Sequence, residues 1–377
     1  MAINVNDLMG VLILAENQNI LKELTMRRQL AAIPFGARYR IIDFALSNLV
    51  NAGIRNVGVF VQEKYRSLMD HLGIGKEWDL NRQRDGLFIL PPEKYNDGSN
   101  SLVLNGDILL LRRHLDYLIR SKQEYVVIFN GPIVMNIDLK RMFEKHLASN
   151  ADISLLYQVD SSERQRTSNT EILTDQDSRV TSIKINPFVN SSLKMLLDTF
   201  IMKRTLLIEL VDSAVAEGGF DLVRDILIKN LKSLRIYGCE FSGYARKINS
   251  LECYFKTSME LLDPKVSEEL FFAHGPIFTK VKNEPPVIYT KDADVKNSHV
   301  ANGCRIEGTV ENSILFRGVK IEKGAQVKNS IIMQKSSIGN GSALENVIID
   351  KDCVISPNKR LMGAATYPLV IGKATVL

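Results

Sequence analysis

The chain has 377 residues, of which 45% are hydrophobic and 24% are charged, and its net charge is +5. This composition is typical of a globular protein with room for two domains, and no apolar run approaches the roughly 18 residues that span a bilayer. Neither a signal peptide nor a long Lys/Arg block is seen, so we expect a cytoplasmic protein that binds neither membranes nor nucleic acid; anionic metabolites stay open as ligands. The cysteines stand at no zinc-site interval, so free thiols are expected at Cys239, Cys253, Cys304 and Cys353.

An apolar run at residues 10–14 predicts the first strand, and the polar break that follows leads into the start of a helix. In many α/β proteins a loop in this place binds nucleotide phosphates, because its glycines let backbone N–H groups close on the anion. Here the loop holds no glycine and carries the carboxylate of Glu16. At this point the sequence leaves open whether the loop is a dismantled phosphate site or never was one.

Helix-then-strand units repeat from residue 10 to about residue 260, which favours an α/β fold with a mostly parallel sheet covered on both faces. The first predicted helix ends at Gly53, a reasonable C-cap. Residues 170–186 are expected to form a hairpin. The other elements are helices at 43–52, 108–121 and 139–148, and strands at 56–61, 125–129 and 153–157.

Beyond residue 260 the pattern changes. A linker with little helical period is expected at 261–290, where four prolines stand. In residues 291–377 apolar residues recur six apart and glycines stand at likely corners, which predicts a parallel β-helix. A run of ordinary hairpins would instead show a period of two. The apolar series are Leu315, Ile321 and Val327; Ile332, Ile338 and Leu344; and Ile348 and Val354.

Residues 33–73 closely resemble bacterial ADP-glucose pyrophosphorylase, the enzyme that makes ADP-glucose for glycogen. The resemblance covers essentially the whole chain. It implies a Rossmann-like nucleotidyltransferase domain over 1–260, a linker over 261–290 and a left-handed β-helix over 291–377, assembled in a tetramer. Further matching stretches are WDLNR (78–82), LFILPPE (87–93), EYVVIFNG (124–131), FDLVRDIL (220–227), GYARKINSLECYFKTSM (243–259) and GCRIEGTVENSILFRGVKIEKGAQVKNSIIM (303–333).

The resemblance also shows what the catalytic positions have lost. Active members read Ala-Gly-Gly-x-Gly-Thr-Arg-Leu where this chain has Glu16 and Asn17, so Cβ atoms fill the space that the triphosphate needs and Glu16 repels it. Such enzymes hold Mg²⁺ with two carboxylates, which neutralises the phosphate during in-line attack. Pro132 and Lys247 stand at those two positions, so no metal is expected here and Mg²⁺ is expected only at a partner's site.

Three more family motifs are altered. The Lys-Pro-Ala after the glycine-rich loop begins with Leu30, and the glucose-1-phosphate lysine is replaced by Asn186. The Gly-Thr-Ala-Asp motif is reduced to Gly106-Asp107. One loss could be offset by a neighbour, such as Lys184 reaching a phosphate, but so many independent losses, two of them metal ligands, predict an inactive site.

The family includes a catalytically degenerate GlgD-type subunit, which this sequence resembles. That likeness implies a regulatory role beside a catalytic GlgC-type subunit in a likewise implied heterotetramer, with a homo-oligomer as another option. Two alternatives stay open. A weak or altered nucleotidyltransferase could use Asp138, Asp221 or Asp225, although helix caps or salt bridges are the simpler roles for them. A β-helix acyltransferase would use His299, for which a solvent-facing corner is the simpler place.

Three arginines are candidates for binding a small anionic effector. In allosteric members of the family, basic residues at the positions of Arg27, Arg28 and Arg40 contact phosphorylated or carboxylate effectors. The planar guanidinium suits such anions because it makes paired, charge-assisted hydrogen bonds. The family's neighbouring histidine is Pro34 here. The alternatives are plain solvation, or pairing of Arg40 with Asp43 one helical turn on.

Overall fold

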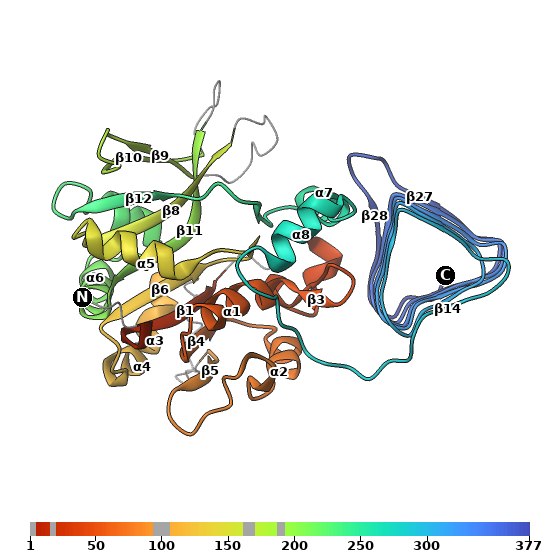
Figure 1. Ribbon diagram of the computed structural model, residues 1–377, viewed down its shortest axis with the longest axis horizontal. Coiled ribbons are helices and arrows are strands. Elements are labelled where there is room, and N and C mark those ends of the chain that lie inside the picture. Colours follow the sequence, from red (N-terminus) through yellow and green to blue (C-terminus); the bar gives the residue numbers. More distant parts are fainter. Residues whose placement is uncertain (1–4, 16–19, 93–105, 161–169, 187–192) are drawn as a thin grey trace. The chain divides into compact units, whose positions relative to one another are not determined.

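The computed structural model describes residues 5–15, 20–92, 106–160, 170–186 and 193–377 (Figure 1). Across these residues no helix is long and apolar enough to cross a membrane. All four cysteines are free thiols, as expected from their spacing. The chain forms two compact units, each built from separate stretches: unit 1 is Met1–Glu16, Phe44–Lys247 and Phe272–Phe278, and unit 2 is Asn17–Asp43, Ile248–Phe271 and Thr279–Leu377.

Unit 1 is built on a nine-stranded mixed sheet that contains the parallel run β6-β1-β4-β5. Strand β1 is buried at every position, because it lies inside the sheet and is apolar throughout. β11 runs antiparallel to β6 and carries β8 and β9 beside it. The strands are β1 (Leu8–Leu14), β4 (Asn56–Val61), β5 (Gly86–Leu90), β6 (Tyr125–Asn130), β8 (Ile153–Asp160), β9 (Thr170–Thr174), β10 (Val180–Ile185), β11 (Leu193–Lys203) and β12 (Ile236–Glu240).

The helices of unit 1 follow the predicted alternation with one break. The helix expected at 108–121 is two helices, because His114 takes a non-helical backbone conformation. The expected hairpin is the antiparallel pair β9–β10. The helices are α1 (Ile41–Asn51, which begins in unit 2), α2 (Arg66–Leu72), α3 (Asp107–Arg113), α4 (Leu115–Arg120), α5 (Leu139–Ala148), α6 (Arg204–Ala216) and a π-helix, Leu222–Ile228.

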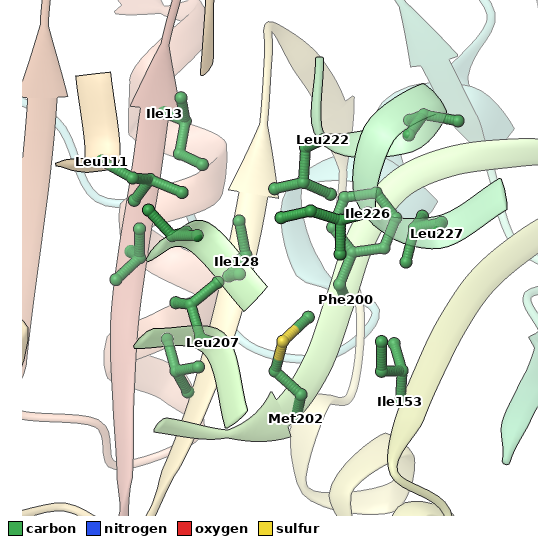
Figure 2. Close-up of a cluster of buried hydrophobic side chains, with 14 of the residues drawn as sticks. Ile13, Leu111, Ile128, Ile153, Phe200, Met202, Leu207, Leu222, Ile226 and Leu227 are labelled. Atoms are coloured by element: carbon green, nitrogen blue, oxygen red, sulfur yellow. The ribbon is translucent and has the colours of Figure 1, made fainter. Parts of the chain in front are cut away.

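One large apolar core holds unit 1 together. Phe200 of β11 lies beside Ile226 of the π-helix, and Met202, Ile13 and Ile128 belong to the same cluster, which extends across β1 and β6 (Figure 2). Each such buried side chain contributes on the order of 1.5–3 kcal/mol. This core fixes the carboxyl ends of β1 and β6, where the candidate site lies.

The C-terminal part of unit 2 is a parallel β-helix, as the sequence predicts, and it is triangular when seen end-on (Figure 1). Its three sides are five-stranded parallel sheets. The first sheet is β14 (Ile288–Tyr289), β17 (Arg305–Ile306), β20 (Lys320–Ile321), β23 (Ser337–Ile338) and β26 (Val354–Ile355). The second is β15 (Asp294–Lys296), β18 (Thr309–Glu311), β21 (Gln326–Lys328), β24 (Ala343–Glu345) and β27 (Arg360–Met362). The third is β16 (His299–Val300), β19 (Ile314–Leu315), β22 (Ile331–Ile332), β25 (Val347–Ile349) and β28 (Leu369–Ile371).

The predicted six-residue spacing is wrong at its last step. Ile314 pairs with Ile331, and Ile331 with Ile348, so these two coils take 17 residues each and one of their three sides is a residue shorter than the other two. The interior of the last coil therefore holds Ile349 and Ile355 in place of Ile348 and Val354. Val354 is 44% exposed.

The segments of unit 2 before the β-helix are short and closely packed. The expectation of little helix in the linker is wrong at its start, because Pro264 begins a helix, a position that proline favours. Tyr254 donates its hydroxyl hydrogen to the carbonyl of Pro34 at 2.6 Å. These elements are two 3-10 turns (Lys22–Thr25 and Leu30–Ala32), β2 (Pro34–Phe35), β3 (Tyr39–Arg40), α7 (Leu251–Glu260) and α8 (Pro264–Phe272, whose last residue is in unit 1).

Candidate functional site

The candidate site of unit 1 lies where β1 and β6 end. The backbone N–H of Gly131, just after β6, donates to the carbonyl of Ile13 near the end of β1 at 3.1 Å. A short ribbon follows, in which β7 (Ile133–Met135) pairs with β13 (Ala245–Lys247) and places Lys247 opposite Ile133. The structure therefore brings Pro132 and Lys247 together. Glu16 and Asn17 fall outside the described residues.

Lys247 forms an ion pair with Asp198. Asp198 lies where the register between β11 and β8 shifts, and its backbone has a φ of 41°. Its side chain is 9% exposed and that of Lys247 29%. The ammonium and the carboxylate neutralise each other at the place where the resemblance puts a metal-binding carboxylate.

These residues do not fit Mg²⁺. The ion takes oxygen ligands, whereas Pro132 has no side-chain donor and is buried, and the Lys247 ammonium repels a cation. The Asp198 carboxylate is already engaged by Lys247. In the described ranges no group of three or more His, Cys, Asp or Glu side chains could hold a metal ion.

Asp107 is the buried carboxyl next to this site. Its Oδ1 accepts the backbone N–H groups of Ile108 and Leu222, both at 2.8 Å, and its Oδ2 accepts the side-chain amide of Asn130 at 2.7 Å. Burial, followed by the charge of Asp221, raises the pKa of Asp107 to about 7. With these bonds Asp107 ties the end of β6 to the starts of α3 and the π-helix.

The three aspartates of the alternative enzymatic reading have structural roles. Asp138 caps α5 by accepting the N–H of Arg141 at 3.1 Å, and Asp221 caps the π-helix. Asp225 accepts two backbone N–H groups, at 2.9 and 3.0 Å, and lies 3.8 Å from the ammonium of Lys229. Cap and salt bridge are the roles expected of such residues.

The other altered positions belong to other elements of the chain. Leu30 is buried in the second 3-10 turn of unit 2. Asn186 is exposed just after β10, with a φ of 51°. Lys184, a possible substitute for the lost lysine, lies 3.8 Å from Glu171 across the hairpin.

The candidate effector arginines of unit 2 differ in their surroundings. Arg27 is exposed. Arg28 is buried, where its guanidinium pairs with Asp350 and donates from Nε to the carbonyl of Leu24 at 2.9 Å. This pair ties the first 3-10 turn to the β-helix, so Arg28 is a structural residue.

Arg40 is half-buried at the start of α1. Its backbone N–H donates to Asp43 Oδ2 at 2.9 Å, so the expected proximity to Asp43 is present and involves the backbone. Its positive charge acts on two lysines of the β-helix region, lowering the pKa of Lys351 and of Lys282. Arg40 therefore belongs to a larger group of cations.

We call this group the basic cluster: Arg40, Lys282, Arg317, Lys335 and Lys351. Burial, then Arg40 and Arg28, lowers the pKa of Lys351 to about 6, against the opposing effect of Asp350. Burial, then Arg317 and Lys335, lowers the pKa of Lys282. Since neighbouring cations add to the effect of burial on Lys282 and Lys351, a bound anion would relieve repulsion at this place.

Sequence reasoning missed four members of the basic cluster. Arg317 and Lys351 stand 34 residues apart, which is two coils of 17, so the coil length would have placed them at one corner. Lys335 follows at the same corner, whereas Lys282 precedes the first coil and leaves no periodic signal.

His299 was expected at a solvent-facing corner, but it is half-buried in strand β16, and burial lowers its pKa.

Comparisons with known proteins agree with this architecture. Residues 19–187 match the family described as nucleotidyl transferase, and residues 287–364 match the family described as GlmU-like, C-terminal hexapeptide. The hexapeptide match and the three parallel sheets identify the β-helix as left-handed.

Among full-length relatives, the glycogen biosynthesis protein GlgD of Bacillus subtilis is 43% identical, covering 98% of this chain and 97% of its own. GlgD of Geobacillus stearothermophilus is 42% identical with the same coverage. A glucose-1-phosphate adenylyltransferase of Geobacillus stearothermophilus is 31% identical, covering 82% of this chain and 80% of its own. The chain therefore belongs to the GlgD family of glycogen biosynthesis proteins.

Proposed function

We propose that this protein is the non-catalytic, regulatory subunit of a heteromeric ADP-glucose pyrophosphorylase. The observation that carries the proposal is the Lys247–Asp198 ion pair beside Pro132, at the positions where the resemblance requires two metal-binding carboxylates. Without those carboxylates the phosphate charge is not neutralised in the transition state, and each lost ligand removes several kcal/mol of stabilisation. Chemistry and Mg²⁺ would then belong to a catalytic partner subunit.

The relatives support a division of labour. Geobacillus stearothermophilus has both a protein named GlgD and one named glucose-1-phosphate adenylyltransferase, and this chain is more similar to the former. We infer that the partner is a GlgC-type subunit and that the two form a heterotetramer. A subunit without chemistry can change its partner's activity only by binding one conformation of the partner more tightly, an effect of about 1–3 kcal/mol.

The basic cluster is the proposed effector site. Lys282 lies within electrostatic reach of the other four cations, and the carboxylates that oppose their charge are those of Asp43, Asp350 and Glu284. A small phosphorylated or carboxylate metabolite would satisfy this excess. Arg28 would position the cluster through Asp350, while Arg40, with the lysines, would contact the anion.

The test is a rate assay of the chain alone and mixed with a GlgC-type subunit. Alone, with ATP, glucose 1-phosphate and millimolar Mg²⁺, it should give negligible ADP-glucose; turnover within about tenfold of a typical ~10 s⁻¹ would contradict the proposal. In the mixture it should change the partner's rate, substrate affinity or effector response by roughly 5- to 150-fold. Kinetics equal to those of the partner alone would rule out a regulatory role.

The effector site is tested in the same mixture. Arg40→Ala should weaken the response to an anionic effector while co-assembly persists, because one half-exposed cation contributes little to folding. Arg27, which is exposed, is also an effector candidate, so Arg27→Ala tests whether this side chain contributes to the response. A response that Arg40→Ala leaves unchanged would place the effector elsewhere.

A further inference from the structure

The second sheet of the β-helix carries alternating charges along its outer face. The middle residues of its strands, such as Val310 and Val327, point into the core, so the first and third residues point outward. Strand pairing places the third residues in one column that crosses the coils. In coil order this charge column is Lys296, Glu311, Lys328 and Glu345, and Met362 follows it in the last coil.

Within the chain the charges of the column attract one another only weakly: the charge of Glu311 is the smallest of the effects on the pKa of Lys296, after the contact with Asp294 and the effect of burial. Lys296 pairs with Asp294 on its own strand, at 2.9 Å. In the described part of the chain no ion pair engages Glu311, Lys328 or Glu345, although neighbouring strands lie only about 4.8 Å apart. Lys296 and Lys328 are exposed, and Glu311 and Glu345 are half-exposed. The column is therefore available to charges on another molecule.

The column has an even number of charges whose signs alternate. When a second copy of the column is placed opposite the first in reversed order, each positive charge therefore faces a negative one. We consider a second copy related to the first by a two-fold axis that runs parallel to the strands and passes between the second and third coils. This rotation places Lys296 of one chain opposite Glu345 of the copy. Glu311 then meets Lys328 of the copy, and the reciprocal contacts repeat both pairs. We propose that this face of the β-helix is a self-association surface for a second copy of this chain, with the two coil axes antiparallel.

The other outward positions of the same sheet are compatible with this pairing. Under the same two-fold rotation Asp294 faces Ala343, and Thr309 faces Gln326. None of these contacts opposes two like charges, and the Asp294 charge is already balanced by Lys296.

The other two faces lack this property. On the first sheet the corresponding rotation would oppose Arg305 with Lys320, two cations. On the third sheet the outward residues Ile314, Ile331 and Ile348 are apolar and already buried. The second sheet is thus the one side of the triangle whose exposed charges fit a copy of themselves.

The expected association is weak and salt-dependent. Five strands at about 4.8 Å spacing give a face only about 24 Å long, at the small end of protein interfaces. Charges on such a face set orientation and partner choice more than they set affinity. This pairing requires no catalytic partner, so it can be tested on the full chain alone.

The experiment inverts the charges and then mixes the two proteins. The inverted variant carries Asp294→Lys, Lys296→Glu, Glu311→Lys, Lys328→Glu and Glu345→Lys, which keeps every neighbouring charge relation within one chain. It should self-associate as the wild type does. Mixed pairs of wild type and variant would oppose like charges at all four contacts, so at low salt they should fall at least about tenfold below random pairing.

Native mass spectrometry of differently tagged chains counts the pairs. At about 1 M salt, where the Debye length is about 3 Å, the sorting should disappear. The control Arg305→Glu with Glu307→Arg inverts an ion pair on the first sheet and should mix freely with the wild type. Random mixing of the inverted variant at low salt, sorting by the control, or a wild type that stays monomeric would each overturn the proposal.

A second variant tests the proposal even if the charge-inverted chain does not fold. Glu311→Gln with Lys328→Gln removes the two central charges and keeps similar side-chain size. Its self-association at low salt should weaken at least about tenfold, because the two contacts nearest the axis lose their attraction. Unchanged association in sedimentation velocity would overturn the proposal independently of the mixing assay.

Discussion

Replacing Arg28 with alanine should destabilise unit 2 strongly. The side chain of Arg28 is 6% exposed and that of its partner Asp350 is 1% exposed, so the ion pair is shielded from water. Without the guanidinium, the Asp350 carboxylate keeps one hydrogen bond that the structure gives, from the backbone N–H of Lys351 at 2.7 Å. Removing one partner of a buried pair costs about 3–5 kcal/mol, because the other charge stays buried without compensation.

The neighbouring lysine makes this cost depend on pH. Arg28 is one of the charges that lower the pKa of Lys351 to about 6. In the variant the pKa of Lys351 should rise, and its ammonium should then offset part of the lost charge beside Asp350. Protonation favours this compensation, so the loss of stability should be smaller at pH 6 than at pH 8.

Thermal unfolding followed by far-UV circular dichroism measures the effect. For a unit of 150–250 residues each kcal/mol lowers Tm by about 2–4 °C, so Arg28→Ala should lower it by roughly 6–20 °C. The adjacent Arg27→Ala is the matched control and should stay within about 0.5 kcal/mol of the wild type. The double variant Arg28→Met with Asp350→Leu should recover most of the loss, because no charge is left unpaired. A Tm for Arg28→Ala within about 2 °C of the wild type would refute the structural role assigned to the pair.

Three further predictions concern Asp107, Lys351 and Gly308. The pKa of Asp107 is raised to about 7, so the native state binds more protons than the unfolded state between about pH 4 and pH 7. The stability of the wild type therefore falls as the pH rises through that range. In urea unfolding, Asp107→Asn should be more stable than the wild type at pH 8 and similar to it at pH 5. Because the pKa of Lys351 is lowered, binding of an anion should be coupled to protonation of this lysine. Calorimetry with inorganic phosphate, corrected for phosphate ionisation, should therefore show tighter binding at pH 6 than at pH 8. Equal affinities at the two pH values would contradict this. A Cβ at Gly308 would lie 2.3 Å from the carbonyl oxygen of Ala325, so Gly308→Ala should cost at least about 1–3 kcal/mol, whereas Gly372→Ala, which has open space, should cost little; equal Tm values for the two would contradict the clash.

Local patterns were sufficient to predict several of the regular elements. The α5 boundaries match the predicted helix at 139–148, since its apolar positions recur at the helical period and Asp138 supplies the cap. The break at His114 had no such signal, because a single non-helical residue leaves the apolar spacing on both sides unchanged. The six-residue period predicted the β-helix, yet it could not show which coils depart from a length of 18 residues.

The sequence by itself determined the family, the fold class and the loss of the metal carboxylates at Pro132 and Lys247, because each rests on which residue stands at a position in the chain. The tertiary structure alone decided what the charged residues contact. Lys247 forms its ion pair with Asp198. Arg28 forms its ion pair with Asp350, which lies 322 residues further along the chain. Lys351 belongs to the basic cluster together with Arg40. Charges act through distance and burial, and neither quantity can be computed before the chain has brought remote segments together.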